Sequence, residues 1–211
     1  MTTTRLPRSF YARKAHEVAP DLLGHVLVRA FPDGRRAAAR IVEVEAYEPN
    51  DPASHAFRGL TARNAVMFGP PGHLYVYFTY GMHHCMNAVT GPAGEGAAVL
   101  LRAAEPLEGA DEMAARRARD RLLDLCSGPG RLTQARGVAR PDDGLDLVAG
   151  DRMWVETGSR PEPIAAGIRV GVHETTRRWR FWLEGNGFVS RGRPGPPTAK
   201  SRTPRVRSTT P

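Results

Sequence analysis

The strongest local signal in this chain is a run of four chain-breaking residues, Gly69-Pro70-Pro71-Gly72, followed at once by an aromatic segment. Residues 73–80 (HLYVYFTY) predict a strand, because aromatic and β-branched residues bounded by Gly and Pro are typical of strands. Gly81 then predicts a hairpin tip, with residues 84–90 as the returning strand. The segment therefore predicts antiparallel β-structure near the middle of the chain.

Strands and helices follow no regular alternation elsewhere, which predicts an α+β fold with a mostly antiparallel sheet. Helices are expected over 15–23, ending at Gly24, over 111–125, and after a cap at Ser127. Residues 1–8 and the Pro- and Arg-rich tail 191–211 predict disorder, leaving one domain that ends at residue 190. The further expected strands are 25–31, 38–47, 97–104, 153–156, 169–172 and 180–183.

The charge of the chain is uneven. The net charge is +8, but six basic residues and no acidic residue follow Phe188, so the rest of the chain carries about +2. Charge alone is therefore weak evidence that the folded part binds a polyanion. Lys14 and Lys200 are the only lysines. An internal lysine that could form a Schiff base is thus nearly excluded.

Two further features concern the cellular setting. Cys85 and Cys126 are the only cysteines and form no C-x-x-C spacing, which predicts two reduced, buried thiols. The N-terminus has no apolar signal region, and no stretch approaches the roughly 20 apolar residues of a membrane helix. We expect a cytoplasmic protein, nucleoid-associated if bacterial, with no membrane partner.

The segment RIVEVEAY, residues 40–47, places two carboxylates on one strand face. By the two-residue repeat of a strand, Glu43, Glu45 and Tyr47 point to the same side, with the carboxylates roughly 7 Å apart. Such a pair is typical of a solvated face. The functional alternative is that one glutamate accepts a proton from an attacking water and stabilises an oxocarbenium-like carbon.

The aromatic strand offers a second candidate site. Tyr75 and Tyr77 share one face, an arrangement found more often in a core than in a base-stacking platform. Tyr80 and Met82 flank Gly81 at the hairpin tip. Large apolar residues at an exposed tip are poor design for a monomer, but they suit a wedge that fills the gap left by an extruded base.

Polar candidates outside these two strands are scattered. His55 alone predicts, by default, a satisfied core histidine. His83, His84 and Cys85 could suggest metal binding, but neighbouring strand residues point to opposite faces, so we expect no metal site. The other candidates are Arg63-Asn64, Asn87, Arg102 and Arg131.

Taken together, these segments resemble the alkyladenine DNA glycosylase family, also called methylpurine or 3-methyladenine DNA glycosylases. The similarity runs from about Phe10 to Val189. It implies a single compact α+β domain with a curved antiparallel sheet, flanking helices and a protruding DNA-intercalating hairpin. The matching blocks, in order, are LLGHVLV, RIVEVEAY, the His55 loop, Arg63-Asn64, Met67-Phe68, LYVYFTYGMHHCMN, VLLRAAEPLEG and LCSGPGRLTQA.

The resemblance also implies an activity. Family members remove alkylated or deaminated purines from damaged double-stranded DNA by simple hydrolysis, without metal or organic cofactor, and a monomer is implied. Glu45 matches the general base and Arg102 a polar residue near the water and the target phosphate. Tyr80 matches the side chain inserted into the DNA, with Met82 beside it.

The remaining matches concern base and backbone contacts. Tyr47, His55 and Tyr77 match the groups that sandwich the flipped base, and Asn87 matches the floor that disfavours a 2-amino group. Arg131 falls where the family places a phosphate contact, and Arg63 is expected on the DNA backbone as well. Two departures stand out: the loop before His55 is one residue shorter than in vertebrate members, and His83-His84 replaces aromatic residues.

Two other classes of function compete with this interpretation. One is a non-catalytic lesion- or DNA-binding protein, which Glu45 beside Tyr47 argues against, because a carboxylate near the DNA backbone weakens binding unless chemistry needs it. The other is a hydrolase of small nucleosides or carbohydrates, which the hairpin-tip Tyr80 disfavours. Assays for free base from alkylated DNA, and for duplex against nucleoside substrates, distinguish them.

Overall fold

The two longest strands, β2 (Arg36–Tyr47) and β5 (Ala97–Glu108), pair with each other at the centre of one antiparallel sheet. This arrangement is taken from a computed structural model, which describes residues 4–160, 162–172 and 176–191. The other strands are β1 (Val26–Ala30), β3 (Leu74–Thr79), β4 (His83–Thr90), β6 (Met153–Glu156), β7 (Ile164–Gly167) and β8 (Arg180–Leu183). The predicted α+β class and mostly antiparallel sheet are confirmed.

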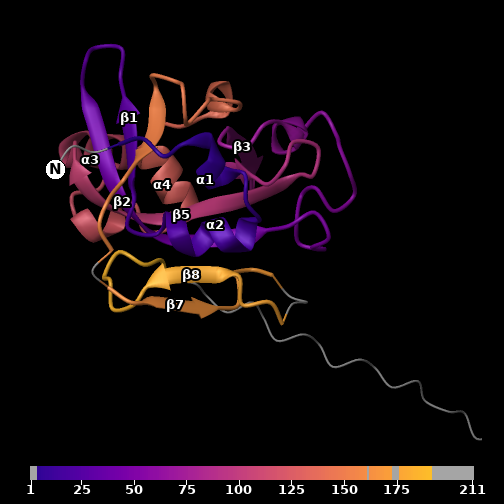
Figure 1. Cartoon of the computed structure of the whole chain (residues 1–211). Coiled ribbons are helices and arrows are strands. Elements are labelled where there is room, and N and C mark those ends of the chain that lie inside the picture. The colour runs from indigo at the N-terminus through magenta and orange to yellow at the C-terminus, as the bar shows by residue number, and fades with distance from the viewer. Residues whose placement is uncertain (1–3, 161, 173–175, 192–211) are drawn as a thin grey trace, which may run out of the picture.

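The sheet runs in the order β3-β4-β5-β2-β1-β6, with β8 also paired to β2 and β7 to β8. Figure 1 shows the sheet curled, with the β7–β8 pair lying along one side of the curl. The α-helices that flank it are α1 (Arg8–Tyr11), α2 (Ala15–Leu22), α3 (Ala110–Arg117) and α4 (Pro129–Ala135). Short 3-10 turns are η1 (Ala65–Phe68), η2 (Leu122–Asp124) and η3 (Arg140–Asp142).

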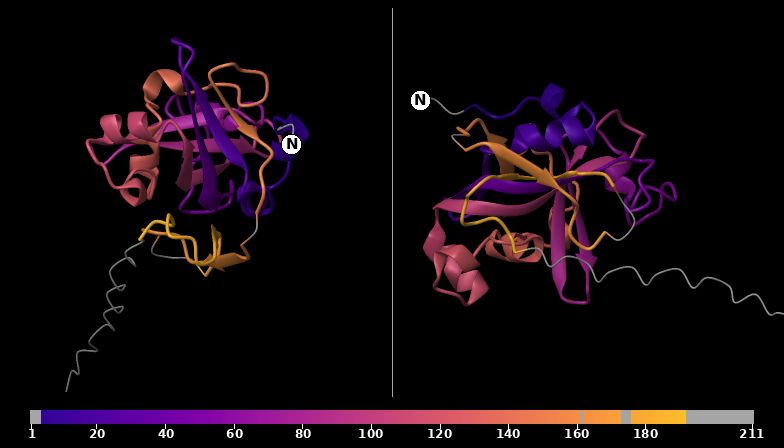
Figure 2. Two further views of the ribbon diagram at one scale, coloured as in Figure 1. Left: turned by 90° about the vertical axis from the view of Figure 1, so that its left-hand side faces the viewer. Right: turned by 90° about the horizontal axis from the view of Figure 1, so that it is seen from below.

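The β3–β4 hairpin extends beyond the sheet. Strand β4 pairs with β5 only over residues 87–90, whereas it pairs with β3 as far as His83. Among the described residues, the outer half of β4 therefore pairs with β3 alone. This part of the hairpin projects from the body of the protein in the right-hand view of Figure 2. Its tip turns through Tyr80 and Gly81, both with positive φ, of 52° and 67°. Glycine suits this backbone, whereas tyrosine adopts it at some cost.

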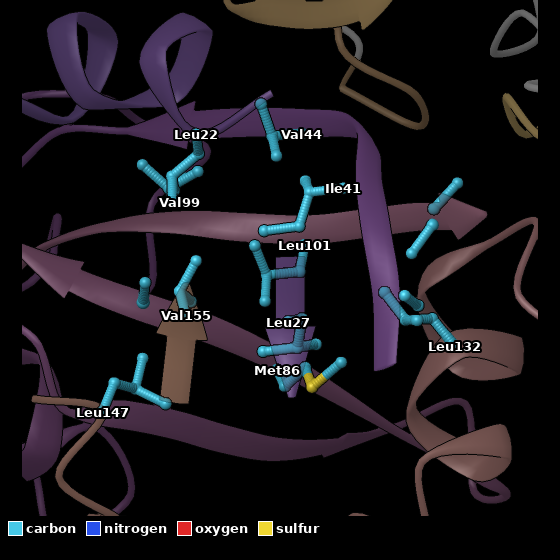
Figure 3. Close-up of a cluster of buried hydrophobic side chains, with 14 of the residues drawn as sticks. Leu22, Leu27, Ile41, Val44, Met86, Val99, Leu101, Leu132, Leu147 and Val155 are labelled. Carbon is cyan, nitrogen blue, oxygen red and sulfur yellow. The ribbon is translucent and has the colours of Figure 1, made fainter. Parts of the chain in front are cut away.

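The core fills the inside of the curl. Leu27 from β1, Met86 from β4 and Leu101 from β5 meet there, and Leu22 of α2 and Leu132 of α4 reach into the same cluster (Figure 3). Packing of this kind leaves few voids, so the sheet that carries the site is held rigidly. Both cysteines are free and buried, as the sequence predicts. Over the described residues, no helix has the length and apolarity to cross a membrane.

Three expectations from the sequence are wrong in their extent. Helix α3 ends at Arg117 rather than running to residue 125, because Ala118 takes a left-handed conformation and no apolar residue follows before Leu122. Residues 169–172 form no strand, and β7 ends at Gly167. Disorder over 1–8 does not hold for residues 4–8, since the Leu6 side chain is buried and its N–H donates to Val155 O.

We predict that Leu101→Ala lowers the free energy of unfolding by about 2–5 kcal/mol, because Leu101 is fully buried and the cavity cannot close completely. Chemical denaturation measures this. Leu107→Ala, on the same strand but 55% exposed, is the matched control and is expected to stay within about 0.5 kcal/mol. Equal losses in the two variants would show that the cluster is not the core.

Candidate active site

Both glutamates of the RIVEVEAY segment are fully buried, in contrast to the solvated face that their pattern favours. Strand β2 pairs with β5 on one edge, and on the other with β1 and then, over residues 43–45, with β8. Register shifts against β5 on both sides of Glu43 bend the strand here. Glu43 and Glu45 therefore lie inside the protein, where a carboxylate requires partners.

Glu43 uses its oxygens on structural partners. Its Oε1 accepts from Arg102 Nε and Arg180 Nε, both at 2.8 Å, and its Oε2 accepts from the Ser190 N–H at 2.7 Å. Two cations and one backbone donor thus surround this carboxylate, and Glu43 does not line the pocket described below. It is an anchor that joins β2, β5, β8 and the end of the described chain.

Glu45 also has three partners, but it faces an open space. Its Oε2 accepts from the Tyr47 hydroxyl at 2.9 Å, and its Oε1 accepts from the Val170 N–H at 2.7 Å. Arg102 Nη1 lies 3.2 Å from the same Oε1. Unlike Glu43, Glu45 lines the pocket, so an activated water could reach it.

Arg102 links the two carboxylates. Burial alone would lower the pKa of its guanidinium, but Glu45 and Glu43 outweigh that effect and raise it. The side chain is therefore a fixed positive charge, 6% exposed, beside the pocket-facing carboxylate. Such a charge can orient a water and stabilise a developing anion.

The pocket has a volume of about 530 Å³, which is within the range of small-ligand sites. Its walls come from strands β2 to β5, the loops after β2 and β7, the hairpin tip and the start of α4. It joins the carboxylate of Glu45 to a group of aromatic rings. The lining residues are Glu45, Tyr47, Pro52, Ala53, His55, Tyr77, Thr79, Tyr80, Cys85, Leu100, Arg102, Pro129, Val170, Gly171 and Val172.

Three predicted base-binding side chains come together here. The rings of Tyr75 and Tyr77 stack at 5.6 Å, and the His55 ring stands edge-on to Tyr77 at 4.5 Å. The His55 Nδ1 lies 3.0 Å from the Tyr75 hydroxyl. Tyr47, on β2, lines the same space. The strand repeat predicts that Tyr75 and Tyr77 share one face. His55 and Tyr47 were predicted to join these aromatic groups from the family resemblance alone.

The aromatic groups of the pocket are uncharged near neutral pH. Burial, reinforced by the Glu45 carboxylate, raises the pKa of Tyr47, and burial raises the pKa of Tyr75 to about 12. Burial of the His55 ring, followed by the positive charge of Arg63, lowers the pKa of that imidazole. His55 stays accessible from the pocket, and its lowered pKa favours the neutral imidazole near pH 7. The slot between Tyr47, His55 and Tyr77 is thus suited to a flat heterocycle.

A smaller hollow of about 80 Å³ lies behind the main pocket. Asn87 lines it together with Tyr75 and Met67, and is 4% exposed. The Asn87 Nδ2 donates to Tyr75 O at 3.2 Å, which fixes the orientation of the amide. Asn87 thus borders the small hollow, where the floor of a base-binding pocket would lie.

The hairpin tip lies at the edge of the pocket. Tyr80 lines the pocket, yet the residue is 87% exposed, and Met82 is 70% exposed. Further down the hairpin, the rings of the cross-strand pair Phe78 and His84 lie 5.1 Å apart at a tilted angle. The tip therefore presents apolar groups to solvent directly beside the aromatic slot.

The two predicted backbone contacts lie on different sides. Arg63 Nη2 donates to Phe78 O at 3.1 Å, so Arg63 braces the hairpin. Arg131, on α4, lines a second hollow of about 410 Å³ that shares Arg102 with the main pocket and also contains Arg121 and Arg191. Both arginines are exposed.

Sequence reasoning missed several residues that complete the site. Val170 supplies the N–H that binds Glu45, and Arg169 lies with its guanidinium 4.5 Å from the centre of the Tyr47 ring. Both fall in the segment mistaken for a strand. No local pattern marks them, because their partners are more than 110 residues away along the chain.

Comparison with known proteins shows the family of the chain. The family model described as methylpurine-DNA glycosylase matches residues 9–187. The chain belongs to the methylpurine-DNA glycosylase family. Three relatives carry the name "Putative 3-methyladenine DNA glycosylase". The Burkholderia lata protein is 53% identical over 191 residues, covering 88% of this chain and 90% of that protein.

The other two relatives are almost as similar. The Streptomyces avermitilis protein is 50% identical over 214 residues, covering 98% of this chain and 97% of its own length. The Methanocella arvoryzae protein is 48% identical over 196 residues, covering 90% and 98%. The resemblance seen in the sequence is thereby confirmed, and the chain is by family a DNA N-glycosylase.

We predict that the His55 imidazole titrates below the usual value of about 6.5. Arg63→Gln should move its midpoint upward by part of the shift, because the positive charge goes while the burial stays. NMR titration of the histidine ring protons measures both values. Arg131→Gln, which removes a charge that does not lower the pKa of His55, is the control. An unchanged midpoint in Arg63→Gln would contradict this assignment.

Proposed function

We propose that this protein extrudes an alkylated or deaminated purine from duplex DNA and hydrolyses its N-glycosidic bond with a water activated by Glu45. The product is an abasic site in an intact strand. The observation that carries the proposal is a fully buried carboxylate that faces an aromatic-lined pocket with Arg102 at 3.2 Å. Family membership supports the same class of reaction.

The chemistry follows from the partners of Glu45. A water in the pocket gives a proton to Glu45 as its oxygen attacks the sugar carbon C1′. The C1′–N bond breaks and its electron pair leaves with the purine. The carboxylate of Glu45, which faces the pocket, also favours the oxocarbenium-like carbon in the transition state. Arg102, held by both glutamates, orients the water.

Binding of the base rests on stacking in the slot formed by Tyr47, His55 and Tyr77. A cationic purine, such as an N3-alkylated adenine, is attracted to electron-rich rings and is a good leaving group. A neutral deaminated purine lacks both advantages and needs a proton on the leaving base. Neutral aromatic groups in the slot repel neither substrate.

The hairpin tip supports extrusion of a base from a duplex. An extruded nucleotide leaves a gap in the stack, and flipping costs a few kcal/mol, least for weakly paired lesions. Tyr80 can fill that gap with Met82 beside it, because both are exposed on a narrow projecting turn. We expect the exposed Arg63 and Arg131 to contact phosphates of the bound duplex, which would make binding dependent on salt.

The lysine content favours a glycosylase without lyase activity. A lyase step needs an amine that attacks the sugar. Lys14 does not line the pocket, and Lys200 lies outside the described residues. Water is therefore the proposed nucleophile, and the strand stays intact.

We predict that Glu45→Gln lowers single-turnover release of purine by about 10²- to 10⁴-fold, since an amide cannot take a proton from water. Binding of lesion-containing duplex should persist, because Gln has the same shape. The measurement is free base released from a duplex with one defined lesion, beside a binding titration. Retained turnover would remove Glu45 from the proposed role.

Tyr80→Ser should weaken the complex with lesion duplex by about 1–3 kcal/mol, the usual worth of one stacking contact. Binding of undamaged duplex should change much less, because no base is then replaced. Leu107→Ser, an exposed leucine on β5, serves as the control. Equal losses on damaged and undamaged DNA would count against an intercalating tip.

A further inference from the structure

Arg169 is a buried arginine next in sequence to Val170, which binds Glu45, and it lies outside the pocket lining. It is 2% exposed and sits in the loop that follows β7. Its guanidinium lies 4.5 Å from the centre of the Tyr47 ring and 5.5 Å from that of Trp179. Arg169 does not line the pocket itself, so it does not touch a bound base.

Its hydrogen bonds tie together two other segments. Nη1 donates to Ala46 O, in β2, at 2.8 Å, and also to the Asp51 carboxylate. Nη2 donates to the second oxygen of Asp51 at 3.0 Å. This two-pronged pairing is the geometry that the planar guanidinium of arginine provides and lysine does not. The end of β2 and the loop 48–54 are thereby fixed to the loop after β7.

The residue that follows Arg169 touches the carboxylate of Glu45. The Val170 N–H donates to Glu45 Oε1 at 2.7 Å, and the Tyr47 hydroxyl donates to Oε2 at 2.9 Å. One of these donors is a peptide neighbour of Arg169, and the other belongs to the ring that Arg169 covers. Apart from Arg102, Glu45 is held by the Val170 N–H and the Tyr47 hydroxyl, and the positions of both depend on the guanidinium of Arg169.

We propose that Arg169 is a positioning residue for the glycosylase reaction, holding the Val170 N–H and the Tyr47 ring so that Glu45 points at the water. The inference rests on the proposed role of Glu45 as the base. The two donors restrict the rotation of the carboxylate and leave its remaining lone pairs to the pocket. Misplacing a reacting group by about 1 Å can lower a rate about 10²-fold, so a small shift of this loop is enough to matter.

The test replaces Arg169 by lysine, which keeps the charge but cannot bind Ala46 O and both Asp51 oxygens together. We expect the single-turnover rate of base release to fall about tenfold or more. The dissociation constant for lesion-containing duplex should stay within about twofold, because Arg169 does not contact DNA. A purely structural role would leave the rate of the folded fraction unchanged.

Arg29→Lys is the matched control. Arg29 is also buried, bonds to the buried Asp142 at 3.1 Å, and shares that aspartate with a second arginine, Arg152, as Asp51 is shared with Arg177. It does not line the pocket. Thermal unfolding of both variants shows whether each is folded at the assay temperature. Arg29→Lys is expected to lose stability and keep its rate.

Three outcomes separate the proposals. A slow Arg169→Lys with unchanged affinity, beside a normal Arg29→Lys, supports the inference. If folded Arg169→Lys releases base as fast as the wild type while Glu45→Gln is inactive, the inference is overturned and the role of Glu45 stands. If Glu45→Gln is active, the proposed function fails first and the inference falls with it.

Discussion

The structure depends on the burial of two carboxylates, Glu43 and Glu45, on the central strand β2. Placing a charge in a protein interior costs several kcal/mol unless it is paired and hydrogen-bonded. Glu43 and Glu45 meet this requirement with two cations, Arg102 and Arg180, so the cluster is balanced in charge. The backbone N–H groups of Ser190 and Val170 donate further hydrogen bonds to Glu43 and Glu45, respectively.

This requirement explains why distant segments converge on β2. Strand β8 pairs beside Glu43 and supplies Arg180, and Ser190, seven residues after β8 ends, binds the same carboxylate. The loop after β7 supplies the donor for Glu45. The two glutamates are thus divided in role, since Glu43 is enclosed by partners and Glu45 opens on the pocket. A rigid scaffold then presents the slot and the projecting tip on the same side of the sheet.

Local signals in the sequence predicted most of the strands and the hairpin. Gly24 and Gly81 do have the positive φ that their turn positions suggest, and the strand 153–156 was predicted at its observed limits. The glutamates were harder to interpret, because an alternating Glu-Val-Glu pattern is the same on a solvated face and in a buried network. Only the partner strands β5 and β8 decide between these, and their residues lie far along the chain.

The errors have the same origin. Residues 169–172 have the composition of a strand, but Arg169 is drawn to Asp51 and Gly171 has a positive φ, so the segment forms a loop. Residues 4–8 look too polar and too short to order themselves, yet Arg5 bridges to Glu156 at the edge of the sheet. The grouping of Tyr47, His55 and Tyr77 came from the family resemblance and not from their spacing in the sequence. The path of the loop that carries His55 cannot be predicted from its residues.

The central claim is that Glu45 holds the attacking water beside an extruded nucleotide. It is tested most directly by a crystal structure of the protein with a duplex that carries a stable, positively charged analogue of an abasic sugar. The account predicts one ordered water within hydrogen-bond distance of both Glu45 and Arg102, facing the position of C1′, with the side chain of Tyr80 in the vacated stack. A sugar that lies beyond the reach of Glu45, or an unbroken base stack with Tyr80 outside it, would contradict the account.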